Sequence, residues 1–156
     1  MKLKTIALGT AVSMTVAAAA IAAAHENMPA QIVARHGLMT VISLNLGVVG
    51  DMARGRAEYD ADAAKVAADN LAAVAGISQE LLWPEGTSSD DREDSRALPK
   101  VWEDRAGFDA AWDDYGTAAA ALAEVAADGS DALGGAMGAL GKSCGNCHDT
   151  YRKPKD

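Results

Sequence analysis

The stretch LGGAMGALGKSCGNCH, residues 133–148, decides the fold of this chain. Its apolar residues recur at intervals of four, three, four and three positions, at Leu133, Met137, Leu140, Cys144 and Cys147. That spacing places them on one face of an α-helix, because about 3.6 residues make one turn. The run Asp-Gly-Ser-Asp at 128–131 carries residue types that end one helix and begin another. The sequence therefore predicts an amphipathic helix near the end of the chain.

The same periodicity predicts three earlier helices. They run from about Pro29 to Met52, from just after Asp60 to Gly76 or Glu80, and from near Lys100–Glu103 to Ala126. The third should direct its aromatic side chains inward, at Phe108, Trp112 and Tyr115. Between the second and third, residues 83–99 are rich in proline, glycine, serine and charge, which is typical of a solvated loop. These segments predict an all-α, antiparallel up-down-up-down four-helix bundle.

The composition of the 156-residue chain excludes several classes of protein. Its 49% hydrophobic residues are enough to bury a core, whereas its 4% aromatic residues and many alanines disfavour a β-sandwich or barrel. It has 22 acidic and 14 basic residues, so its formal net charge is −8. A nucleic-acid-binding protein needs a basic surface to neutralise phosphates, so that class is excluded.

Residues 1–24 have the pattern of a secretory signal peptide. Lys2 and Lys4 precede an apolar run that ends in three alanines, a small-residue cleavage pattern. We expect cleavage before His25, which leaves a single domain at 25–156 with a net charge of −10, and export to the periplasm of a bacterium. A retained membrane anchor is the alternative, although the run is only weakly hydrophobic.

Cys144-Gly145-Asn146-Cys147-His148 is a C-x-x-C-H motif, the attachment signature of a c-type haem. Two thiols three residues apart can form thioethers with the two vinyl groups of one porphyrin, and the adjacent imidazole can bind the iron. On a helix, Cys144, Cys147 and His148 project from one face. The motif predicts one covalent haem c held by Cys144 and Cys147, with His148 as an axial ligand of the iron.

Three other interpretations of the two cysteines are weaker. A thioredoxin-like redox pair needs a βαβ context, which this sequence lacks. A zinc site needs further ligands, and the remaining histidines are only His25 and His36. A disulfide between Cys144 and Cys147 would close a very small loop and would not explain His148.

The chain resembles the class II cytochromes c, the cytochrome c′ family, in which four helices carry C-x-x-C-H near the C-terminus. The other matching stretches are GRAEYD at 55–60, WPEGT at 83–87, PKVW at 99–102, Phe108, and Tyr151-Arg152. The resemblance covers essentially all of the chain after the leader and implies one haem c. The acidic loop Ser89–Ser95 is longer than in many relatives.

The resemblance also points to the residue on the distal face of the haem. In the family that residue lies in the first helix, 20 positions before the tyrosine of the turn, and counting back from Tyr59 gives Met39. Low-spin members bind iron through a methionine here, so the chain is identified as a low-spin, methionine-ligated member with His148 and Met39 as axial ligands. High-spin members usually carry Leu, Phe or Tyr, and occasionally a methionine that does not coordinate. A methionine on a helical stripe is also commonly plain core filler.

Two arginines and one histidine lie near these positions. Arg35 matches an arginine that the family places near the haem propionates, and a solvated charge is the equal alternative. Arg152 could lie beside His148, where its charge would favour ferrous iron. His36 is expected to be a surface residue.

These features favour a periplasmic carrier of single electrons over an enzyme, since no acid–base or nucleophilic group accompanies the motif. Its acidic charge should attract redox partners with basic patches, and haem attachment requires the cytochrome c maturation machinery. The resemblance adds a homodimer through the first two helices as a candidate assembly. The alternative function is a five-coordinate, high-spin cytochrome c′ that binds NO or CO, with Met39 only covering the iron.

Overall fold

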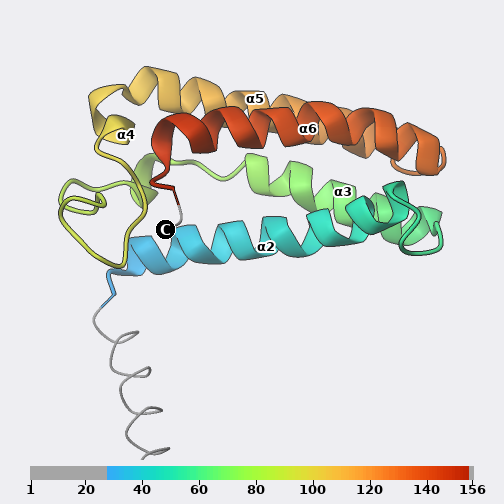
Figure 1. Ribbon diagram of the computed structural model, residues 1–156, viewed down its shortest axis with the longest axis horizontal. Helices are drawn as coiled ribbons and strands as arrows, with labels where there is room; N and C mark the ends of the chain where they lie inside the picture. Colours follow the sequence, from blue (N-terminus) through green and yellow to red (C-terminus); the bar gives the residue numbers. More distant parts are fainter. Residues whose placement is uncertain (1–27, 155–156) are drawn as a thin grey trace, which may run out of the picture. The chain divides into compact units, whose positions relative to one another are not determined.

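A computed structural model describes residues 28–154, and residues 31–154 belong to one structural unit. The expected signal peptide, its cleavage site and His25 lie outside the described residues. Within this unit, long helices run antiparallel to their sequence neighbours (Figure 1). The elements are α2 (Ala30–Ala53), α3 (Ala61–Ala75), the 3-10 turn η1 (Glu80–Leu82), the short α4 (Lys100–Glu103), α5 (Arg105–Val125) and α6 (Ser130–Tyr151). The predicted all-α four-helix bundle is confirmed.

The helix ends show where the predicted boundaries hold and where one fails. Asp60 caps α3 as expected, since its carboxylate accepts a hydrogen bond from the Ala63 amide at 2.9 Å. The third predicted helix is in fact two, because Asp104 leaves the helical conformation at φ −130° and ψ 57°. The Asp104 carboxylate accepts from the Gly107 amide at 3.2 Å and so caps α5. A capping residue inside a continuous apolar pattern therefore divides the segment.

The main hydrophobic core lies between all four long helices. Its fully buried side chains include Leu71 of α3, Leu122 of α5, and Leu133 and Leu140 of α6. The backbone of α5 comes close to both α3 and α6, whereas α2 joins the core through side chains such as Val49. Phe108 and Tyr115 are buried and Trp112 is partly buried, as the sequence predicts.

The loop at residues 83–99 is not the solvated connection that its composition predicts. Thr87, Ser88 and Ser95 are buried, and the Ser95 hydroxyl donates to the Thr87 carbonyl at 2.8 Å. The loop also pairs with the end of α6, where the Leu98 amide donates to the Tyr151 carbonyl at 3.0 Å. Polar side chains form hydrogen bonds with backbone groups inside the loop. Residues 83–99 are therefore a fixed part of the fold, although their composition is that of a solvated loop.

The outer face of α2 is unusually apolar. Val33, Val41, Leu44 and Val48 are all exposed, and Leu44 keeps 70% of its surface accessible. The helix is long and apolar enough to cross a membrane by length and composition alone, with a mean hydropathy of 1.5. Its opposite face carries the buried Ile32, Ile42 and Val49, so within the described residues α2 serves as a helix of the bundle.

Candidate functional site

The last turns of α6 bring the three residues of the predicted haem motif together. Cys144, Cys147 and His148 are half-buried, and within residues 28–154 both thiols are free. Cys144 packs against the main core, and Cys147 packs against a second cluster formed by Val101, Phe108 and Tyr151. Three donor atoms thus project from one helical face at the junction of two apolar clusters.

An aromatic wall lies beside Cys147 and consists of Trp83, Phe108 and Tyr151. The ring centroids of Trp83 and Phe108 are 4.8 Å apart, those of Phe108 and Tyr151 are 5.4 Å apart, and both pairs meet edge to face. The ring centroids of Trp102 and Trp83 are 6.2 Å apart, also edge to face, and the Trp102 indole N–H donates to the Trp83 carbonyl at 3.0 Å. Three segments distant in sequence therefore form one rigid apolar surface next to the cysteine.

Arg35 of α2 is buried next to this wall, so it is not the solvated charge that the sequence left open. Its guanidinium lies 4.4 Å from the centre of a Trp83 ring, and its Nη2 donates to the Thr87 carbonyl at 3.3 Å. Burial lowers the pKa of Arg35, and the carboxylate of Asp94 partly opposes that effect. Among the described residues, Arg35 Nη1 is buried and has no hydrogen-bond partner. A buried cationic donor without a partner fits an anionic group brought by a ligand.

Met39 lies on the core-facing stripe of α2, four residues after Arg35 and three before Ile42, yet 41% of its surface is exposed. Within the described residues it belongs to neither hydrophobic cluster, whereas its neighbours Leu38 and Leu46 pack against the main core. Its side chain is therefore available to contact a group bound between α2 and α6. In Figure 1 the N-terminal half of α2 and the C-terminal end of α6 lie at the same end of the bundle.

The environment shifts the protonation of all three motif residues. Burial raises the pKa of Cys144, and burial together with Cys144 raises the pKa of Cys147. Burial also lowers the pKa of His148, and the charge of Arg152 adds to this effect. A lowered pKa keeps the imidazole neutral with a free lone pair, which is the form that binds iron. Arg152 and His36 are both exposed, as expected for His36.

Tyr115, beside Cys144, gives a test of this packing. Its hydroxyl donates to the Leu71 carbonyl at 2.9 Å, and burial raises the pKa of Tyr115 to about 12. Between pH 10 and about 12 only the unfolded state should lose this proton. We expect the free energy of unfolding to fall across that interval and the near-ultraviolet difference spectrum between wild type and Tyr115→Phe to titrate near its upper end. A difference spectrum that titrates at the ordinary tyrosine pKa would contradict this packing.

Comparison with known proteins identifies this arrangement. Residues 30–152 match the family model described as Cytochrome C'. The chain belongs to the cytochrome c′ family. Cytochrome c-554 of Cereibacter sphaeroides is 43% identical over 119 residues, which cover 76% of this chain and 90% of that protein. A solved cytochrome c′ from Rhodobacter, 34% identical, superposes with a TM-score of 0.78 over 80% of this chain and 96% of its own.

Two further solved members of the family carry functional descriptions. A ferrous arginine-to-lysine variant of cytochrome c′ from Alcaligenes xylosoxidans, 26% identical with a TM-score of 0.70, holds bound NO. Another cytochrome c′, 27% identical with a TM-score of 0.70, shows ligand-controlled dissociation of its dimer. Each match covers 80% of this chain. It covers 94% of the Alcaligenes protein and 95% of the dimeric cytochrome c′.

The cytochrome c′ family binds one covalently attached haem c with iron, so this chain is a c-type haem protein. Its own residues fit that group, because two free thiols and an imidazole share one helical face and a buried arginine nitrogen lacks a partner. In the sequence, Trp83 stands out only as the first residue of the family match at 83–87. Its ring contacts with Arg35 and Phe108 arise from tertiary packing, which no local pattern in the sequence signals.

Proposed function

We propose that Cys144 and Cys147 carry the haem through thioethers, that His148 binds the iron on the proximal side, and that Arg35 holds a propionate. The shared helical face of the three motif residues supports the attachment. The unpartnered Nη1 of Arg35 supports the propionate contact, since a guanidinium can donate to a carboxylate in a fixed geometry. When bound, the haem supplies an iron that can change its oxidation state and accept a further ligand.

The function that the comparisons favour is binding of a small diatomic ligand, NO or CO, on the face opposite His148. The observation that carries this proposal is the match to cytochromes c′, one of which has been solved with NO bound. In such a protein Met39 would cover the haem without binding the iron.

A second function, single-electron transfer through a His148 and Met39 ligand pair, has one observation in its favour. Met39 lies on the stripe of α2 that faces the core, in register with Arg35. A thioether bound to iron would fill the sixth position, exclude diatomic ligands and raise the reduction potential. The sequence alone favours this function, whereas the matches to cytochromes c′ favour ligand binding.

The visible spectrum of the ferrous protein, with and without CO, distinguishes the two functions. For the ligand-binding protein we expect one broad visible band, a clear change on addition of CO, and no change in the CO-free spectrum of Met39→Leu. Met52→Leu is the matched control, because Met52 is a buried core methionine of the same helix. Sharp α and β bands that persist under CO in the wild type and disappear only in Met39→Leu would overturn ligand binding in favour of electron transfer.

The remaining parts of the proposal concern location and assembly. We propose that residues 1–24 direct export to the periplasm, that maturation machinery there attaches the haem, and that basic redox partners reduce the protein. We also propose a homodimer through α2 and α3. The exposed apolar stripe of Val41, Leu44 and Val48 supports it, and a relative forms a dimer that dissociates under ligand control.

A further inference from the structure

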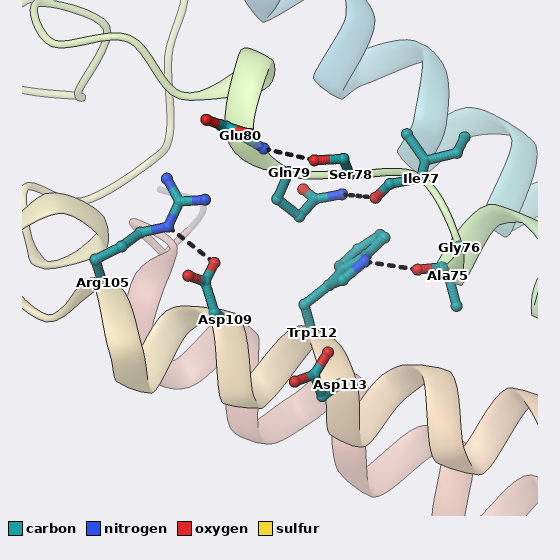
Figure 2. A pocket seen from close by; sticks show the side chains of 10 residues that line it. All are labelled: Ala75, Gly76, Ile77, Ser78, Gln79, Glu80, Arg105, Asp109, Trp112 and Asp113. Atoms are coloured by element: carbon teal, nitrogen blue, oxygen red, sulfur yellow. Dashed lines mark hydrogen bonds and ion pairs between the residues drawn. The ribbon is translucent and has the colours of Figure 1, made fainter.

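A surface pocket lies between the end of α3, the η1 turn and the first half of α5. Its volume is about 430 Å³, and Figure 2 shows segment 75–80 crossing opposite the side chains of α5. The Trp112 indole stands at its centre and donates its N–H to the Ala75 carbonyl at 3.0 Å. That hydrogen bond fixes the ring, so the pocket has a rigid aromatic floor.

The charge around the pocket is negative. Glu80, Asp109 and Asp113 line it, and the only lining cation among the described residues is Arg105. The Nε of Arg105 already donates to Asp109 at 2.8 Å, which leaves Glu80 of the η1 turn and Asp113 of α5 as exposed acids of the lining. The lining thus carries three carboxylates and one guanidinium, so a cationic group that enters the pocket would meet a net negative charge.

An apolar contact adjoins these acids. Ile77 is 41% exposed and Leu81 is 82% exposed, and Ile77 also lines the pocket. A small apolar surface with an acidic rim is complementary to a protein surface with an apolar centre and a basic rim. It does not suit an acidic protein, a nucleic acid or an anionic membrane, all of which it would repel.

The floor of the pocket is connected to the haem-attachment residues. The ring centroids of Trp112 and Tyr115 are 5.1 Å apart, with planes inclined by 40°. Tyr115 belongs to the main core, and Cys144 packs against that core. Two aromatic rings therefore join the pocket surface to the cysteine that we propose carries the haem.

We propose that this pocket is the docking surface for a basic redox protein and that electrons cross between the partner and the haem beside Trp112. The proposal rests on the proposed attachment of the haem at Cys144 but holds for either proposed function, since a ligand-binding haem must also be reduced. A lysine or arginine of the partner enters between Glu80 and Asp113, and its apolar centre covers Leu81. No bond forms or breaks, and one electron moves in each encounter.

The test measures oxidation of the ferrous holoprotein by tris(1,10-phenanthroline)cobalt(III), a cation with apolar rings. One electron passes from Fe(II) to Co(III), which gives Fe(III) and Co(II). In Glu80→Gln/Asp113→Asn we expect the second-order rate constant at low salt to fall about fivefold. The control Glu58→Gln/Glu124→Gln removes the same charge in the turn before α3 and in the last turn of α5, and its rate should fall by less than about twofold.

Equal rates in the two double variants would overturn the proposal, because the effect would then report net charge alone. Oxidation by ferricyanide, an anion, should not slow in either variant, and a fivefold fall with that reagent would equally contradict it. Calorimetric titration of the ferric protein with tetralysine gives a readout that is independent of electron transfer. Binding should weaken in Glu80→Gln/Asp113→Asn and not in the control. A failed CO experiment would leave all these outcomes unchanged, so the two proposals fail separately.

Discussion

The double variant Cys144→Ala/Cys147→Ala, expressed in a host that can mature c-type cytochromes, should carry no covalent haem. Its intact mass should equal that of the bare chain, and acidified acetone should extract any colour. The reason is that the two thioethers are the only covalent bonds we propose between protein and porphyrin, and His148 alone holds the group through a bond that acid breaks. We expect this variant to lose all of its covalently bound haem.

Lys142→Ala is the matched control for this experiment, because Lys142 is an exposed residue of the same helix two positions before Cys144. Its mass should include one haem, and its colour should resist extraction. A double variant that kept the added mass would place the attachment elsewhere and would refute the proposed roles of both cysteines. Single cysteine variants should keep one thioether and show intermediate yields.

Leu122→Ala should lower the free energy of unfolding by about 3 kcal/mol. Leu122 of α5 is completely buried in the main core, where residues of α3 and α6 surround it. Removal of three carbon atoms from such a site costs their transfer free energy and leaves a cavity that the rigid helices can only partly close. Denaturant unfolding of the holoprotein, followed by circular dichroism, measures the change.

Leu81→Ala provides a control with the same chemistry, since Leu81 is 82% exposed in the η1 turn. Its free energy of unfolding should change by no more than about 0.5 kcal/mol. Similar losses in the two variants would mean that burial in this bundle does not determine the effect, and would contradict the assigned core. The haem stays attached in both unfolded states, so its bonds do not bias the comparison.

Some parts of the fold and site could be predicted because they depend on short-range patterns. The spacing of Leu133, Leu140 and Cys144 gave a helix that the structure contains as α6, and the cap at Asp60 began α3 where expected. The motif at Cys144–His148 specifies three donors within one helical turn. Helical periodicity and capping depend on residues only a few positions apart, so both can be recognised in the sequence.

Other parts could not be predicted because they depend on which distant segments meet. Asp104 ended one helix and capped the next inside an unbroken apolar pattern. Residues 83–99 had the composition of a solvated loop, yet their hydrogen bonds bury Thr87 and Ser95. The helical spacing places Met39 on the same stripe as Ile32 and Ile42, but it does not predict that 41% of its surface is exposed.

By itself, the sequence determined four helices, their order, and a haem-attachment motif at the end of the last one, because each of these needs only local spacing. The tertiary structure alone decided that Arg35 is buried over Trp83 with one nitrogen unpartnered, and that Trp112 forms the floor of an acidic pocket. Burial and electrostatic environment are properties of segments brought together across the bundle. For that physical reason, no pattern along the chain could have specified them.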